Sequence, residues 1–464
     1  MNHESRITNP EVVIVGGGIA GLAAAWELQK RGVRSVVLEA AARAGGVVLT
    51  ERFDGWVIDA GPDSLLVQKP AAVSLCRELG IAERLHPTLL PRTAYILRDD
   101  RLHPIMEGSA FGFPIRVAPL AASTLFSWRG KLRMAMEVIV PRRTSSEDES
   151  LASFVRRRFG DEAVQYLADP LLAGIHAGDA DRLSTKALFP RFFEVERTKG
   201  SIIRAFRALH VKPSPQGAFV SLPGGTLELV EALAAALDPG TIQLSARASD
   251  LRWQGEFVVD TPTSEVRAPA VILAVPAYAA AGLLRSVDTT LAGLCETIPY
   301  ASTATVAFGY RRDQVGHSLK GSGFVVPRTE QTALLASTWV TSKWPGRAPE
   351  GHVLLRAFLG GGRDPHRLDR SDAELIDTAR EALTDILQIS GEPVFPPRLY
   401  RWTRQSPQFE VGHLDRVAAI ARHLADVPGL FVTGSGFRAI GIPDCIQDGR
   451  DTAARAAEFL QKAS

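Results

Sequence analysis

The chain has 464 residues, of which 45% are apolar and 22% are charged. This balance is typical of a folded globular protein and excludes a mostly disordered chain. Lys and Arg number 53 and Asp and Glu 51, so the formal charge is +2. A surface that binds nucleic acid over its whole extent is therefore excluded, and the length predicts about three domains.

The three cysteines, Cys76, Cys295 and Cys445, lie far apart in the sequence. This spacing excludes a disulfide framework and the usual zinc and iron–sulfur patterns, so we expect no metal ion and a reducing, cytoplasmic location. Residues 1–10 are polar and contain no targeting segment. The longest uncharged runs, 12–26 and 268–284, are shorter than the roughly 20 apolar residues of a membrane-spanning helix.

A strand, a glycine-rich turn, a helix and a second strand open the chain. A β-branched run at 11–15 precedes Gly16-Gly17-Gly18-Ile19-Ala20-Gly21, and the second strand ends at Glu39. In the dinucleotide-binding fingerprint, the glycines permit the tight turn and the approach of a pyrophosphate to the helix N-terminus. A carboxylate at the end of the second strand accepts hydrogen bonds from ribose hydroxyls. The pattern predicts a nucleotide site.

Strands and helices alternate along the rest of the chain, except for a mostly helical stretch at 120–209. No linker separates the segments, so the domains are expected to be interleaved. The other expected strands are 56–59, 94–98, 219–222, 241–245, 257–261, 271–275, 304–310, 352–359 and 430–433, and the other expected helices are 70–79, 372–387 and 447–461.

Two further motifs identify the nucleotide as FAD. Arg43-x-Gly45-Gly46 after Glu39 resembles an extension found in the FAD-dependent amine oxidase superfamily. Residues 430–436 and 441–446 form a strand, a glycine turn and a helix, and they resemble the segment with which that superfamily closes its FAD site. Two distant motifs that share one ligand are more specific than either alone.

Other stretches resemble the oxygen-dependent protoporphyrinogen and coproporphyrinogen III oxidases of haem biosynthesis. Gly61-Pro62-Asp63-Ser64 is similar to their flavin-side loop, and residues 169–179 resemble their substrate-pocket loop. Further similar landmarks are 222–226, 271–276, Trp402, 407–409 and Gly412-His413.

The resemblance implies an α/β (α+β) fold. It combines a Rossmann-like FAD-binding domain built from discontinuous segments with a mixed β-sheet substrate domain and a helical domain. The expected segments are 1–90, 216–292 and 399–464 for the FAD-binding domain, 91–104 and 293–398 for the substrate domain, and 105–215 for the helical domain.

The resemblance also implies a reaction. A porphyrinogen, either coproporphyrinogen III or protoporphyrinogen IX, loses six electrons to become the porphyrin, and oxygen accepts these electrons and is reduced to hydrogen peroxide. Flavin N5 is the expected hydride acceptor, so no catalytic side-chain pair is expected. Two alternatives are another enzyme of the superfamily, such as an amine oxidase or polyene desaturase, and a non-catalytic FAD protein that carries porphyrin. Residues 169–179 argue against the first.

The residues expected to bind FAD come from these motifs and their neighbours. We expect the FAD to be non-covalent, because Cys445 follows Pro443-Asp444 as in the porphyrinogen oxidases that the chain resembles. The expected contacts are Gly16, Gly17, Gly18, Ile19, Ala20, Gly21, Glu39, Ala40, Arg43, Gly45, Gly46, Gly61, Pro62, Asp63, Ser64, Ala248, Trp402, Gly434, Ser435, Ile440, Gly441 and Ile442.

Gly174, His176 and Gly178 are expected to contact the substrate. Glycine allows positive φ and leaves clearance for a flat macrocycle, whereas His176 is either a substrate contact or a structural histidine. In eukaryotic protoporphyrinogen oxidases, an arginine pairs with a substrate propionate, and the matching position here is Ala94. Arg92, two residues earlier, either takes over that role by charge-assisted hydrogen bonds or is a solvated charge.

Basic and apolar residues are interleaved at 113–143. They predict either an amphipathic helix resting on the inner face of an anionic membrane or a solvated face beside a packed core. The sequence leaves open whether the protein forms a homodimer, and no nucleic-acid partner is expected. The residues of this stretch are Arg116, Arg129, Lys131, Arg133, Arg142 and Arg143, with Leu125, Phe126, Trp128, Leu132, Met136 and Val138 between them and Glu137 as the single acid.

Overall fold

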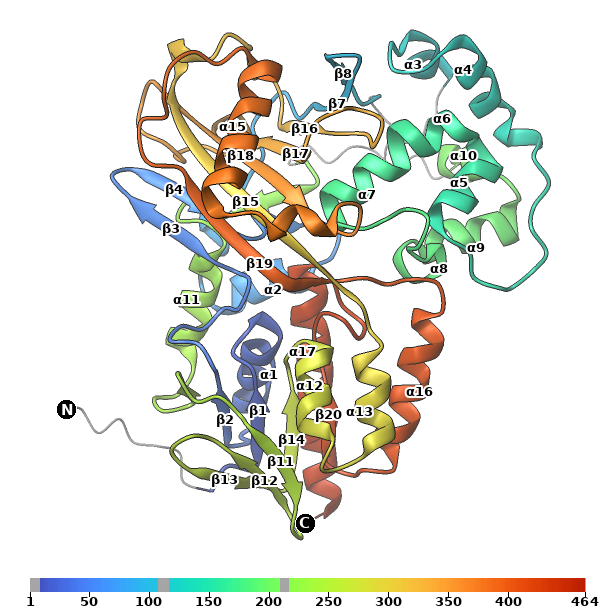
Figure 1. The fold of residues 1–464 in the computed structure, drawn as a ribbon. Helices are drawn as coiled ribbons and strands as arrows, with labels where there is room; N and C mark the ends of the chain where they lie inside the picture. Colours follow the sequence, from blue (N-terminus) through green and yellow to red (C-terminus); the bar gives the residue numbers. More distant parts are fainter. Residues whose placement is uncertain (1–8, 107–116, 209–216, 464) are drawn as a thin grey trace.

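The computed structural model describes residues 9–106, 117–208 and 217–463. Arg116 and the first eight residues, which entered the sequence analysis, lie outside this part. The chain forms two main sheets, one above the other in Figure 1, and a group of helices beside the upper sheet. Within the described residues, no helix combines the length and apolar composition that crossing a membrane requires.

The lower sheet is parallel and has the strand order β10-β2-β1-β14-β20. Its strands are fully or largely buried on both faces, as is typical of parallel sheets, except for the half-buried edge strand β10. Residues that alternate along β1 enter two separate cores, with Ile14 on the side of α1 and α17 and Val13 on the side of α12 and α13. The bounds are β1 Val12–Val15, β2 Ser35–Leu38, β10 Ile242–Gln243, β14 Ala270–Leu273, β20 Leu430–Val432, α1 Ile19–Lys30, α12 Ala277–Leu284, α13 Thr289–Glu296 and α17 Ile442–Ala463.

Strands from three distant parts of the chain therefore form one sheet. The expected Rossmann-like α/β fold built from discontinuous segments is confirmed. Smaller elements lie around and between the two sheets: β3 Thr50–Phe53, β4 Trp56–Asp59, β5 Leu65–Leu66, β6 His86–Pro87, β9 Phe219–Ser221, β11 Asp250–Trp253, β12 Phe257–Asp260, β13 Glu265–Ala268, α2 Ala71–Glu78, α11 Leu227–Ala236 and α16 His413–Ala425.

The upper sheet is mixed and has the order β19-β15-β18-β17-β16-β7-β8, with β16 and β7 parallel. Alternate residues of its central strands pack under α15, where a capping box of Ser371 and Glu374 begins the helix. The opposite face is turned toward the lower half (Figure 1). The bounds are β7 Ala94–Arg98, β8 Arg101–Pro104, β15 Tyr300–Arg311, β16 Gly323–Val325, β17 Leu334–Trp339, α14 Val340–Lys343, β18 His352–Gly360, α15 Asp372–Leu387 and β19 Arg398–Pro407.

β19 spans one expected boundary, and the domain bounds stay a prediction. The strand pairs with β15 from Pro407 to Arg398, so it belongs to the upper sheet, whereas the sequence analysis divided the domains at 398/399. Its polar composition concealed it, because a strand on a sheet edge needs few apolar residues.

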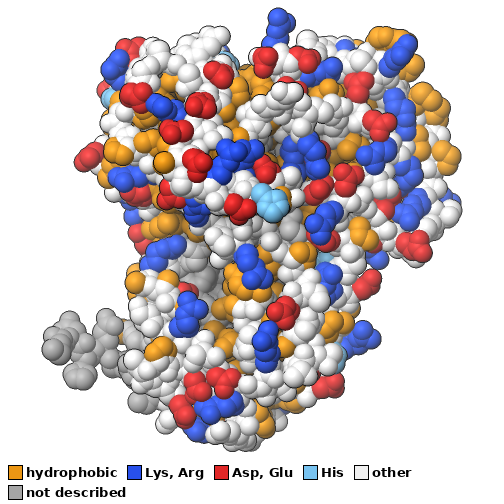
Figure 2. Space-filling view, viewed as in Figure 1, with side chains coloured by type: hydrophobic (Ala, Val, Ile, Leu, Met, Phe, Trp, Pro, Cys, Tyr) orange, Lys and Arg blue, Asp and Glu red, His pale blue; other side chains and the backbone are white. Residues whose placement is uncertain are grey.

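The helical stretch packs beside the upper sheet around its own core. Figure 2 shows hydrophobic side chains gathered at the edge of the molecule formed by α4, with basic side chains among them. The bounds are α3 Val117–Ala122, α4 Trp128–Ala135, α5 Leu151–Phe159, α6 Asp161–Ala163, α7 Asp169–His176, α8 Thr185–Leu188, α9 Pro190–Lys199 and α10 Ile202–Ala208, with a 3-10 turn at Met136–Ile139 after α4.

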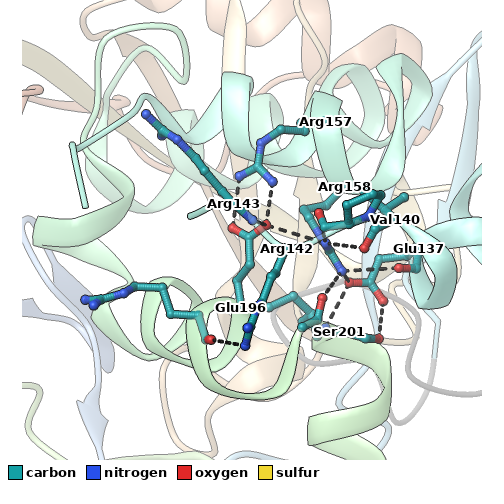
Figure 3. Close-up of polar contacts among 12 residues, drawn as sticks. Glu137, Val140, Arg142, Arg143, Arg157, Arg158, Glu196 and Ser201 are labelled. Carbon is teal, nitrogen blue, oxygen red and sulfur yellow. Dashed lines mark hydrogen bonds and ion pairs between the residues drawn. The ribbon is translucent and has the colours of Figure 1, made fainter. Parts of the chain in front are cut away.

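A fully buried ion pair organises this helical core (Figure 3). Arg158 of α5 pairs with Glu137, which also accepts hydrogen bonds from Ser201 Oγ at 2.6 Å and the Ile202 amide at 2.8 Å. Arg158 further donates to the Gly200 carbonyl at 2.7 Å. One carboxylate and one guanidinium thus join α5, α10 and the 3-10 turn, and the single acid of the basic stretch points inward.

Replacing Arg158 by Met should destabilise the protein by about 3–5 kcal/mol, because Glu137 would be left buried without its counter-charge. Arg156→Met is the control, since Arg156 pairs with Asp161 in solvent and such exposed pairs contribute about 0–1 kcal/mol. Thermal and urea unfolding of both variants measures the difference. Equal stability of the two variants would contradict the role given to the buried pair.

Candidate functional site

The glycines of the first turn have different environments. Gly16 has φ +109°, and a Cβ on Gly21 would lie 2.0 Å from the Gly16 carbonyl oxygen, so these two glycines let β1 and α1 pack closely. A Cβ on Gly18 would meet nothing within 4 Å. Gly18 therefore faces open space at the N-terminus of α1, where the fingerprint places a pyrophosphate.

The N-terminus of α1 is suited to a phosphate. Gly18 is its N-cap residue, no side chain of the described residues caps it, and its first turn contains no acid. The free N–H groups and the helix dipole therefore remain available to an anion. Gly45 and Gly46 form the facing loop, and Gly45 N donates to Gly17 O at 2.8 Å. Arg43 braces this loop by donating to the Gly46 carbonyl at 2.6 Å.

Glu39 lies beside the same turn. Its two carboxylate oxygens accept hydrogen bonds from the amides of Gly17 and Ala41, each at 2.7 Å. A carboxylate has about four acceptor positions, so two are left for ribose hydroxyls. Its carbonyl accepts from Ala246, two residues before the half-buried Ala248, so both residues lie at this edge of the sheet.

The C-terminal glycine turn meets the N-terminal one. A Cβ on Gly434 would lie 3.2 Å from Ala20 Cβ, and one on Gly449 of α17 would lie 2.3 Å from the Ala20 carbonyl oxygen. Asp448 accepts the Gly434 amide at 2.8 Å and fixes the turn. The structure thus brings together the two motifs that the sequence assigned to one ligand, and the helix expected at 447–461 begins earlier, at Ile442.

The two glycine turns and the Gly45-Gly46 loop together form a cradle. The loop at residues 60–64 lies behind this cradle. A Cβ on Gly61 would lie 2.0 Å from the Val47 carbonyl oxygen, next to the Gly45-Gly46 loop. Trp402 of β19 donates its indole N–H to the Ala60 carbonyl at 3.1 Å, and Arg356 of β18 donates to the Gly61 carbonyl at 2.6 Å. The upper sheet therefore holds the 60–64 loop, the expected flavin-side loop, from above.

Asp63 does not present a free carboxylate. Lys343 Nζ lies 2.8 and 2.9 Å from its two oxygens, and Arg356 lies 3.5 Å away. Burial alone would raise the pKa of Asp63, but the charges of Lys343 and Arg356 hold it well below its ordinary value. Sequence reasoning missed both cations. The one available signal was an arginine inside the apolar run of β18.

The sheet face turned toward this loop forms a wall. Cross-strand partners share a face, so the register places Arg356 with Thr338 of β17, and Phe358 with Ala336. Gly174 of α7 packs on the outer end of the wall, and its Cβ would lie 2.9 Å from Val325 Cγ1.

This packing corrects the reason given for two glycines. Neither Gly174 nor Gly178 has positive φ, and a Cβ on Gly178 would lie 2.2 Å from Leu183 Cδ1. Val325 and Leu183 lie where side chains at these positions would be, so the two glycines permit close packing of α7 and of the turn after it. Their contact with substrate stays a prediction.

His176 ends α7 with its backbone carbonyl accepting from Ser406 Oγ and Gln408 Nε2, both at 3.2 Å. Its ring Nδ1 is buried without a hydrogen-bond partner among the described residues. Burial, with a smaller effect from Lys69, lowers the pKa of His176 to about 4. The ring is therefore neutral at pH 7 and too weak a base to accept a proton readily.

Arg92 lies two residues before β7, which begins at Ala94. The half-buried guanidinium donates to the Thr88 carbonyl at 3.1 Å and lies beside Gly217. Its role toward a propionate stays a prediction.

Comparison with known proteins identifies the family. The model of the flavin containing amine oxidoreductase family matches residues 19–457. The chain belongs to this family. A coproporphyrinogen III oxidase of Bacillus subtilis (strain 168) is 36% identical, with 97% of this chain and 98% of the relative covered. The chloroplastic protoporphyrinogen oxidase of Nicotiana tabacum is 28% identical, with 97% and 86% covered.

A crystal structure from Exiguobacterium sp. 255-15, assigned as a protoporphyrinogen oxidase, has a TM-score of 0.87. It is 32% identical and covers 98% of this chain and 100% of its own. The expected membership of the flavin amine oxidase superfamily is confirmed, and the protein is a flavin-dependent oxidoreductase.

Two glycine substitutions test the cradle. Gly18→Val should leave the fold and thermal midpoint of the flavin-free protein unchanged while removing most bound flavin, because its side chain enters the open space above α1. Gly21→Ala should lower the thermal midpoint, because its Cβ meets the Gly16 carbonyl. Flavin absorbance per protein and thermal unfolding separate the two effects. Full flavin content in Gly18→Val would place the phosphates elsewhere.

Proposed function

We propose that the protein oxidises coproporphyrinogen III to coproporphyrin III, with non-covalent FAD as cofactor and oxygen as acceptor, in haem biosynthesis. Six electrons leave the substrate in three two-electron steps, and each pair reduces one oxygen to hydrogen peroxide. The observation that carries the proposal is end-to-end similarity to a relative named coproporphyrinogen III oxidase, 36% identical over 97% of this chain.

Two features support FAD without a covalent bond. An open phosphate cradle and a carboxylate with free acceptor positions suit a dinucleotide. Cys445, the one cysteine of the C-terminal motif, is buried, and burial raises the pKa of its thiol to about 12. The thiol therefore stays protonated at neutral pH and is a poor nucleophile.

The choice of coproporphyrinogen III over protoporphyrinogen IX has two supports. The tobacco protoporphyrinogen oxidase is less similar, at 28% identity, than the Bacillus relative. The arginine that eukaryotic protoporphyrinogen oxidases use for a propionate is replaced by Ala94. Arg92 is the basic side chain nearest to that position in the sequence, and we propose that it contributes to propionate binding.

In this proposal, the protein's side chains bind and orient the cofactor and the substrate, and they exclude water from the site. The bound flavin supplies hydride acceptance. The N-terminus of α1 would hold the pyrophosphate, Glu39 the ribose, and the 60–64 loop with Gly434 and Ser435 the flavin end. The wall of the upper sheet and the end of α7 would enclose the macrocycle, and the neutral His176 would serve as an uncharged boundary.

The domain division follows the same logic. We propose that residues 1–90, 216–292 and 408–464 bind FAD, that 91–104 and 293–407 form the substrate domain, and that 105–215 form the helical domain. The moved boundary keeps β19 with its sheet.

We also propose that the helical domain contacts an anionic membrane surface. Trp128, Leu132, Met136 and Ile139 follow one another at helical spacing and are 69%, 56%, 43% and 68% exposed. Among the described residues of the basic stretch, each exposed ionisable side chain is basic, because Glu137 is buried. Apolar side chains rimmed by cations suit the headgroup region of an anionic bilayer.

The enzymatic proposal predicts rapid porphyrin fluorescence when the purified protein is mixed with coproporphyrinogen III in air. We expect kcat/KM for coproporphyrinogen III to exceed that for protoporphyrinogen IX by about tenfold or more, since one charge-assisted hydrogen bond to a propionate is worth about that factor. Fluorescence no faster than autoxidation would favour a porphyrin carrier, and turnover of amines would favour another branch of the superfamily.

The membrane proposal predicts that Leu132→Glu/Ile139→Glu binds phosphatidylglycerol vesicles at least about tenfold more weakly than the unaltered protein. Val394→Glu is the control, because Val394 is an exposed apolar residue away from the helical domain. Co-sedimentation measures binding, and turnover of dissolved substrate should not change. Equal vesicle binding by all three proteins would contradict the surface assigned here.

A further inference from the structure

A cluster of buried charges lies behind the flavin-side loop. It consists of two carboxylates, Asp59 and Asp63, and three cations, Lys343, Arg347 and Arg356. Asp59, Arg347 and Arg356 are at most 2% exposed, and the side chains of Asp63 and Lys343 are 11% and 14% exposed. Charges this deep in a protein are screened little by solvent or salt.

The pairing within the cluster leaves one cation in excess. Arg347 lies 3.0 Å from Asp59, whose other oxygen accepts from Thr50 and Thr226. Lys343 takes both oxygens of Asp63. Arg356 is therefore left with a distant contact of 3.5 Å to Asp63 and with carbonyl acceptors. Burial lowers the pKa of Arg356, and the neighbouring carboxylates Asp63 and Asp59 offset part of that effect.

The guanidinium of Arg356, which carries the excess charge, contacts the loop that borders the proposed cofactor site. Arg356 donates to Gly61 O at 2.6 Å, and Gly61 packs on Val47 beside the Gly45-Gly46 loop. A Cβ on Gly46 would lie 3.4 Å from the Cα of Gly18, which faces the open cradle. These backbone contacts connect the cluster with the cradle.

We infer that Lys343 and Arg356 are positioning residues for the flavin, which hold the 60–64 loop against it and keep an excess positive charge beside it. The inference rests on the proposed function, because it requires a flavin in this cradle. Positive charge at this place stabilises the electron-rich reduced flavin and raises its reduction potential. The upper sheet thus sets both the place and the electron affinity of a cofactor held mainly by the lower one.

The test compares a variant that removes a positive charge with a variant that removes a negative charge. Lys343→Met removes a cation and Asp63→Asn removes an anion, and both loosen the loop. Each should raise the dissociation constant of FAD by about tenfold or more, since one partner of a buried pair is removed. The reduction potential of the bound flavin should become more negative in Lys343→Met and more positive in Asp63→Asn. If Lys343 and Asp63 only held the loop in place, the two variants would not shift the reduction potential in opposite directions.

The measurements are FAD titration of apoprotein and dye-equilibrated reduction at saturating FAD. Lys343→Arg should restore both values. Lys186→Met is the matched control, because Lys186 is also half-buried over an aromatic ring but lies in the helical domain. Unchanged FAD affinity and reduction potential in Lys343→Met, or reduction potentials that shift in the same direction in Lys343→Met and Asp63→Asn, would overturn the inference and leave the proposed function intact. A purified protein that binds no FAD would overturn both.

Discussion

The close packing of α1 against α17 is the constraint on which the site depends. Gly449 lies so near the Ala20 carbonyl that a Cβ would approach it to 2.3 Å. Because the two helices touch, the glycine turns at the two ends of the chain border one space. In the proposed dinucleotide site, one turn supplies the helix N-terminus and the other closes the opposite side, so both turns are needed.

The upper sheet adds a second constraint, from residues that no motif includes. Trp402 and Arg356 bind successive carbonyls of the 60–64 loop, and Lys343 neutralises Asp63. The two halves of the molecule are therefore tied together through this loop. The lower sheet carries the glycine turns, and the upper sheet fixes the 60–64 loop, which we propose faces the cofactor.

The sequence predicts the local parts of this arrangement and not the long-range ones. The βαβ unit, Glu39 and the C-terminal turn follow from spacing, because their physical requirements are local. The roles of Lys343 and Arg356 depend on strand pairing between distant segments, which spacing does not reveal. Gly174 shows the same limit. Residues 169–179 resemble a substrate-pocket loop, but the side chain packed against Gly174 is Val325, which is distant in the sequence. Only the fold brings the two residues together.

The most direct test of the central claim is a single turnover without oxygen. Oxidised protein is mixed anaerobically with coproporphyrinogen III, and the flavin absorbance near the visible maximum is followed. If the cofactor in this cradle accepts electrons from the macrocycle, the flavin colour bleaches at once and returns when air is admitted. A flavin that stays oxidised while the porphyrinogen remains bound would contradict the account.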